Sequence, residues 1–94
     1  EMKAITTLFD QRVPDFCSMK RSLGHTLAAS GILETVYAIS ALEKNIVPAT
    51  GGFEEIDENI GRSPSRMHAK EINTVLKNSF GFGGNNASII ISRK

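Results

Sequence analysis

The 94-residue sequence predicts a small α/β fold in which the elements follow the order helix, strand, helix, strand, strand. Two observations carry this prediction. Apolar residues recur at helical spacing from residue 26 to about residue 44, and two β-rich runs cover residues 74–79 and 87–92. Glycines separate the two runs, which is typical of a hairpin. A helix combined with such strands predicts one layer with a mixed sheet.

The other elements follow from shorter patterns. Residues 1–9 predict a helix, because their apolar side chains recur at helical spacing. A polar break precedes a short apolar stretch at residues 15–19, where we expect a buried strand. Residues 45–66 contain two prolines and three glycines, and this composition predicts an irregular loop.

The helix over residues 26–44 is apolar on most of its circumference, so we expect it to be largely buried. The small residues at positions 28–31 would let another backbone approach its first turns. A chain of this size has few other helices or strands that could cover such a helix. The chain alone should therefore self-associate or expose a large apolar patch.

Composition and charge exclude several classes of protein. The net charge of +1 creates no field that would attract nucleic acid or an anionic membrane, and no apolar run is long enough to span a bilayer. The single cysteine, Cys17, excludes an internal disulfide and favours a reducing compartment, here the cytoplasm. We expect Cys17 to be packed and inert and His68 to be exposed. Cys17, His25 and His68 lack the sequence spacing of zinc ligands, so no metal site is predicted.

The first candidate site combines Lys20, Gly24, His25 and Glu34. His25 stands at the start of the long helix, where the helix dipole disfavours an imidazolium and favours a neutral ring that donates one N–H to a substrate oxygen. Glu34 lies in the most apolar part of the helix, and a buried carboxylate needs a partner such as Lys20. The alternative is a helix-capping histidine beside a structural Lys–Glu pair.

The second candidate site is the glycine-rich segment over residues 80–86, with Phe80 and Phe82. Three glycines in four residues let a ligand approach the main chain, and a backbone N–H there could serve an oxyanion hole. The alternative is a simple hairpin turn. A phosphate-binding loop is excluded, because no Lys-Ser or Lys-Thr pair follows.

Two segments, Ser18-Met-Lys-Arg-Ser-Leu-Gly-His25 and Asn78-Ser-Phe-Gly-Phe-Gly-Gly84, give the sequence a family resemblance. In this order, with Pro48-Ala49-Thr50 between them, they resemble the last quarter of an elongating β-ketoacyl-acyl-carrier-protein synthase of fatty-acid or polyketide synthesis. The resemblance implies a thiolase-like α/β fold, of which residues 1–94 would be an incomplete C-terminal portion. Arg21 and Asn85 depart from the family pattern.

The resemblance also implies a reaction, the decarboxylative condensation of an acyl group with malonyl-acyl-carrier protein, without a cofactor. His25 would be the second of two catalytic histidines, and Lys20 and Glu34 would form its supporting charged pair. The N–H of Phe82 would join an oxyanion hole, and the Phe82 ring, with Phe80 behind it, would gate the acyl pocket. The resemblance identifies no further substrate-binding residues in this sequence.

The implied partners are an acyl carrier protein, the rest of the ketosynthase chain and a second copy in a homodimer, with no nucleic acid and no membrane. The nucleophilic cysteine and the first histidine would belong to an upstream segment, so we expect the chain alone to be inactive. Two alternatives stay open. One is a non-catalytic homologue, such as a chain-length-factor-like subunit, and the other is a small interaction domain whose helix docks a partner.

Overall fold

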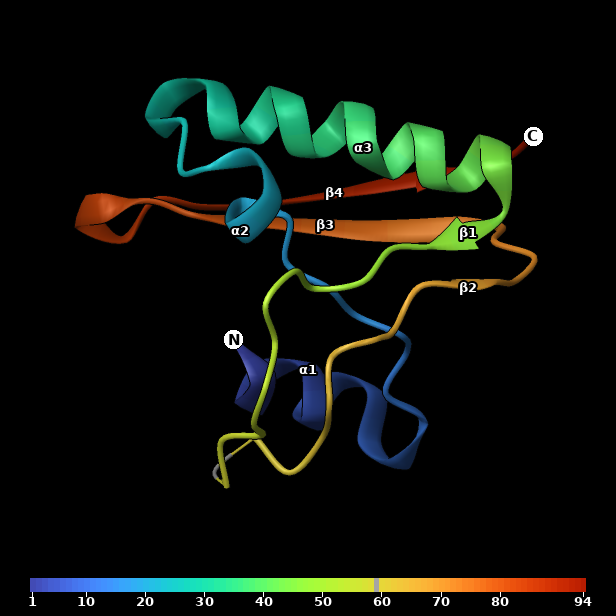
Figure 1. Cartoon of the computed structure of the whole chain (residues 1–94). Coiled ribbons are helices and arrows are strands. Elements are labelled where there is room, and N and C mark those ends of the chain that lie inside the picture. Colours follow the sequence, from blue (N-terminus) through green and yellow to red (C-terminus); the bar gives the residue numbers. More distant parts are fainter. Residues whose placement is uncertain (59) are drawn as a thin grey trace.

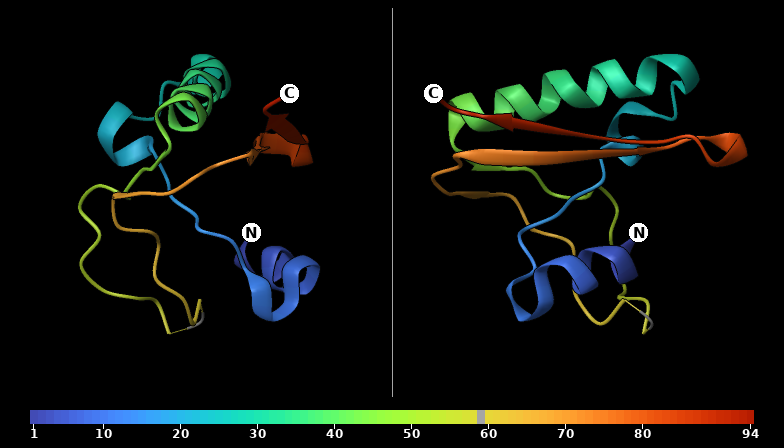
Figure 2. Two further views of the ribbon diagram at one scale, coloured as in Figure 1. Left: turned by 90° about the vertical axis from the view of Figure 1, so that its right-hand side faces the viewer. Right: turned by 180° about the vertical axis from the view of Figure 1, so that it is seen from behind.

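The computed structural model describes residues 1–58 and 60–94; residue 59, within the predicted loop, lies outside the described residues. In chain order the elements are α1 (Met2–Phe9), η1 (Asp10–Arg12), α2 (Lys20–Leu23), η2 (Leu27–Ala29), α3 (Ser30–Lys44), β1 (Ile46–Val47), β2 (His68–Ala69), β3 (Thr74–Phe80), η3 (Phe82–Gly84) and β4 (Asn86–Ser92). Helix α3 runs along the β3–β4 hairpin, whereas α1 lies away from it (Figures 1 and 2). The predicted N-terminal helix and hairpin are confirmed. The helix predicted from residue 26 begins at Ser30, because Leu27–Ala29 form η2, so His25 does not stand directly at its start as expected.

Both sheets in the described part of the chain are two-stranded and antiparallel. Strand β3 pairs with β4 from Thr74↔Ser92 to Phe80↔Asn86, and β1 pairs with β2. The expected mixed sheet is therefore wrong. A parallel pair needs a long crossover connection, whereas the connection between β3 and β4 is a tight turn. The protein is a small α/β unit in which α3 and the hairpin form the layer that positions the candidate sites.

The small core lies where the end of α3 meets β1. Ala38, Ala41, Leu42 and Val47 are buried there. Helix α3 ends at Lys44 and is capped by Asn45, which adopts a left-handed conformation with φ 52°. The Asn45 carbonyl accepts the Lys70 N–H (2.9 Å), and its side-chain oxygen accepts the Ile72 N–H (3.2 Å). One asparagine thus ties the end of α3 to the segment that leads into β3.

The rest of α3 is not buried, so the expectation of a largely buried helix is wrong for these 94 residues. Ile32 is 70% exposed and Val36 56% exposed, and Ile90 on β4 is 70% exposed. The described chain exposes 7285 Å² in total. A folded monomer of this mass would expose about 5,300 Å². Large apolar side chains of α3 and β4 are thus exposed, whereas a contiguous apolar patch and self-association stay predictions.

Residues 15–19 form no strand, which corrects the sequence prediction. The backbone hydrogen bonds of this segment go to loop residues and not to a partner strand. Ser65 donates its N–H to the Phe16 carbonyl (2.8 Å), and Thr50 Oγ1 accepts the Ser18 N–H (2.9 Å). Cys17 is consequently exposed, not packed as expected. The predicted exposure of His68 is confirmed.

Candidate functional site

His25 lies in the connection between α2 and α3 (Figure 1). Helix α2 closes with a hydrogen bond from the Gly24 N–H to the Lys20 carbonyl (2.7 Å), and Gly24 then turns the chain with φ 81°, a left-handed value that favours glycine. The His25 Nδ1 accepts the N–H of Leu27 (3.2 Å). With Nδ1 as the acceptor, Nε2 is the ring nitrogen that remains available as a donor.

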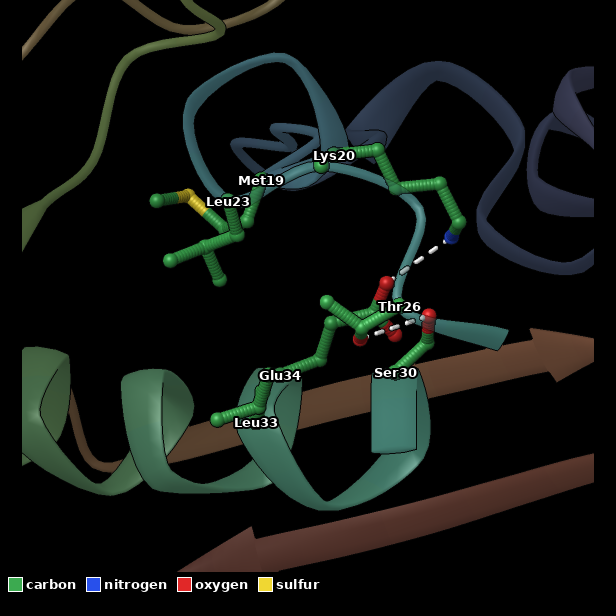
Figure 3. A pocket seen from close by; sticks show the side chains of 8 residues that line it. Met19, Lys20, Leu23, Thr26, Ser30, Leu33 and Glu34 are labelled. Carbon is green, nitrogen blue, oxygen red and sulfur yellow. Dashed lines mark hydrogen bonds and ion pairs between the residues drawn. The ribbon is translucent and has the colours of Figure 1, made fainter. Parts of the chain in front are cut away.

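Glu34 connects three elements through its two carboxylate oxygens. Its Oε1 accepts a hydrogen bond from Lys20 Nζ of α2 (2.8 Å), which Figure 3 shows, and its Oε2 lies 3.4 Å from Lys77 Nζ of β3. Lys20 and Glu34 are therefore paired, as predicted. The position of Lys77 in the site was not predicted, because a lysine inside a strand ordinarily indicates a solvent-facing position.

The environment of Glu34 keeps it ionised. Burial alone would raise the pKa of its carboxyl, but the hydrogen bonds and charges of Lys20, followed by those of Lys77, hold the pKa below its usual range. The side chain of Glu34 is only 15% exposed. The carboxylate is thus a partly buried anion held between two cations.

A narrow pocket lies between α2 and the first turns of α3 (Figure 3). Met19, Leu23 and Leu33 give it an apolar side, while the Lys20–Glu34 pair and the bonded hydroxyls of Thr26 and Ser30 (3.2 Å) give it a polar side. The space between these side chains is too small to hold a water molecule, so the pocket is a close junction of α2 and α3 and offers no room for a ligand.

The glycine-rich segment is a hairpin turn, as the simpler interpretation predicted. The Gly81 N–H donates to the Asn85 carbonyl (2.8 Å), and Gly83 and Gly84 both have left-handed φ values near 80° (79° and 82°). The turn projects the Phe82 ring into solvent, where it is 96% exposed, and Phe80 is 58% exposed. This turn and the beginning of α3 lie at the same end of the layer (Figures 1 and 2).

Cys17 lacks the features of an activated nucleophile. Although part of the residue is exposed at the surface, neighbouring groups desolvate its thiol and raise the pKa, and a raised pKa reduces the thiolate that attack requires. No group of three or more His, Cys, Asp or Glu residues in the described ranges could hold a metal ion. Within those ranges, no helix is long and apolar enough to cross a membrane.

Comparison with known families identifies the chain. Residues 1–54 match the model of the β-ketoacyl synthase C-terminal domain, and this match includes His25, Lys20 and Glu34. The chain belongs to the β-ketoacyl synthase family. The sequence resemblance is therefore confirmed at the level of the family.

Individual synthases match over most of the chain. It is 33% identical to 3-oxoacyl-[acyl-carrier-protein] synthase 1 of Escherichia coli over 99% of its length, which is 23% of that protein. It is 41% identical to synthase 2 of Coxiella burnetii over 81% of its length, 19% of that protein. A putative mitochondrial synthase of Schizosaccharomyces pombe is 39% identical over 81% of the chain. The chain thus spans about a fifth to a quarter of the relatives' length.

Proposed function

We propose that these residues form part of the active site of a 3-oxoacyl-acyl-carrier-protein synthase with a thiolase-like fold. The substrates are an acyl group and malonyl-acyl-carrier protein, in fatty-acid or polyketide synthesis. The observation that carries the proposal is the hydrogen bond from the Leu27 N–H to His25 Nδ1. It leaves the Nε2–H of His25 as the available donor, in a chain whose relatives are named as synthases of this kind.

The reaction proceeds in two stages. A cysteine thiolate outside these 94 residues attacks the acyl thioester and releases the carrier thiol. Malonyl thioester then loses CO₂, and the electron pair of the broken bond moves to the thioester as an enolate. The enolate carbon attacks the acyl-cysteine, which returns an electron pair to sulfur and releases the 3-oxoacyl thioester.

His25 acts in the second stage. Its Nε2–H donates a hydrogen bond to the malonyl thioester oxygen, where negative charge develops as CO₂ leaves. A preorganised donor stabilises that charge more than it stabilises the neutral thioester, and this difference accelerates the step. The Lys20–Glu34 pair holds α2 against α3 and so fixes the turn that carries His25.

The hairpin turn contributes to the acyl site. The N–H of Phe82 serves the oxyanion hole, and the Phe82 ring, with Phe80 behind it, gates the acyl pocket. The high exposure of the Phe82 ring supports this role, because a large aromatic ring in water gains free energy when an acyl chain or another segment covers it.

Residues 1–94 are proposed to be an incomplete C-terminal portion of the synthase, acting with an acyl carrier protein, with further ketosynthase residues and with a second copy in a homodimer. The chain alone is then inactive, because its one cysteine, Cys17, is not the nucleophile. The cytoplasmic location stays a prediction, since the name of one relative places that protein in mitochondria.

Single-turnover kinetics of His25→Ala in the synthase that carries these residues test the proposal. We expect acylation of the nucleophile to change little and condensation to fall by about 10²–10⁴-fold. His68→Ala is the matched control, because it removes an exposed histidine from β2. Condensation by His25→Ala at the wild-type rate would show that His25 is only a structural cap. Stoichiometric acylation of Cys17 in the isolated chain would also contradict the proposal.

A further inference from the structure

Lys77 is the buried charged residue of the described chain, with 8% of its surface exposed at the centre of β3. Side chains alternate along a strand, so Val75, Lys77 and Ser79 share one face. Helix α3 covers that face, because the Lys77 ammonium reaches Glu34 on α3. An ammonium in such a place loses hydration and must be compensated by fixed partners.

The contacts of Lys77 hold its ammonium between the helix and the strand. Its Nζ lies 3.4 Å from Glu34 Oε2 and donates a hydrogen bond to Ser79 Oγ. A Cβ placed on Gly31 would lie 3.6 Å from the same nitrogen, so the first turn of α3 passes directly over the charge.

The two lysines on Glu34 differ in their surroundings. The side chain of Lys20 is 47% exposed and reaches the carboxylate from α2, whereas that of Lys77 is 8% exposed and reaches it from the sheet. Lys77 also precedes Phe80 by three residues in the strand that leads into the Phe82 turn. The Lys77–Glu34–Lys20 chain therefore connects the hairpin to the helix pair that carries His25.

We propose that Lys77 is a positioning residue of the condensation site: it fixes the Glu34 carboxylate against β3, and through Glu34 and Lys20 it sets the place of His25 relative to the Phe82 turn. This inference rests on the proposed function. Lys77 touches no reacting atom. Its effect arises because the oxyanion donor and the histidine lie on different elements, and small displacements between catalytic groups slow a reaction strongly.

The test uses the synthase that carries these residues, with Lys77→Met as the main variant. The variant should fold, because Glu34 keeps Lys20 as its partner. We expect condensation in single-turnover assays to fall by about 10- to 100-fold and acylation to stay within about twofold. Lys3→Met is the matched control, since it removes an exposed lysine from α1 by the same substitution, and its rates should equal those of wild type.

A double-mutant cycle with Glu34→Gln decides whether Lys77 acts through Glu34. The double variant Glu34→Gln/Lys77→Met should condense no more slowly than Glu34→Gln alone, because the carboxylate that Lys77 holds is already lost. Additive losses would overturn the inference. Equal losses of acylation and condensation in Lys77→Met would also overturn it, because they indicate a merely structural role. Wild-type rates in Lys77→Met, with condensation impaired in His25→Ala, would overturn it as well. If His25→Ala condenses normally, the proposed function itself fails.

Discussion

The two motifs that carry the family resemblance lie at the same end of one layer but are held in different ways. The segment from Lys20 to Glu34 is tied by side chains, through the Lys20–Glu34 ion pair and the bond from the Leu27 N–H to His25. The hairpin turn is closed by its own backbone, and its Phe82 ring is 96% exposed. Side-chain changes should therefore matter most in the first motif and backbone changes in the second.

This difference fits the two proposed roles. A histidine that donates to a developing charge must be held in one orientation. The Leu27 N–H of the main chain holds the Nδ1 of His25. An oxyanion donor from the main chain needs only the right backbone path, which left-handed Gly83 and Gly84 supply. The side chain of Phe82 is then left free to contact substrate.

The largest effect on stability is expected for Glu34→Gln. It would leave the buried Lys77 ammonium without an anionic partner, and uncompensated buried charge is costly. We expect the free energy of unfolding to fall by about 3 kcal/mol, measured by urea denaturation of the synthase. Glu43→Gln is the control, because it neutralises an exposed carboxylate on the same helix. Equal stability of the two variants would show that the side-chain network does not hold the first motif.

The sequence predicted α1, α3 and the β3–β4 hairpin because their patterns are local, whereas the short elements α2, β1 and β2 were not predicted. The hairpin strands were placed within one residue of their ends, since apolar, β-branched runs around a glycine-rich turn specify a register. Residues 15–19 were predicted wrongly as a strand. Their apolar side chains fit one, but whether a strand forms depends on a partner edge, and residues distant in sequence decide that.

A motif marked Lys20, His25 and Glu34 as candidates, and of these the Lys20–Glu34 pair is present in the structure, whereas the catalytic roles stay predictions. Lys77 was missed because its role depends on which face of β3 the helix covers, and its partner lies 43 residues earlier in the sequence. A signal was present: Lys77 shares a face with Val75 in a strand that leads into a candidate site. A charge on the covered face of a strand indicates a buried partner.

A smaller loss of stability is expected for Gly83→Ala in the hairpin turn. Gly83 has φ 79°, and a Cβ there would meet open space, so the cost is backbone strain alone. We expect a loss of about 1–2 kcal/mol in the same denaturation assay. Gly83→Asn is the control and should cost less, because asparagine tolerates the left-handed region. If both variants were as stable as wild type, backbone geometry would not be what closes the turn.

The pH dependence of stability separates the two motifs further. The pKa of Glu34 is lowered in the folded protein, so the unfolded state binds the proton more readily. The contribution of Glu34 is therefore present above the ordinary carboxyl pKa of about 4 and is lost as the pH falls through the lowered value. Urea midpoints measured from pH 7 to pH 3 should fall less steeply in Glu34→Gln than in Glu43→Gln. Parallel curves for the two variants would contradict the ion-pair network.

The smallest effect on stability is expected for Phe82→Ala, although its effect on substrate choice should be clear. The ring is 96% exposed, so its removal should change the free energy of unfolding by less than about 0.5 kcal/mol. The backbone N–H remains, so condensation of short acyl groups should continue while the preference among longer chains changes. Assays over a series of acyl lengths, with Phe80→Ala for comparison, measure this. An unchanged preference, or a large loss of stability, would mean that the Phe82 ring serves the fold and not the acyl pocket.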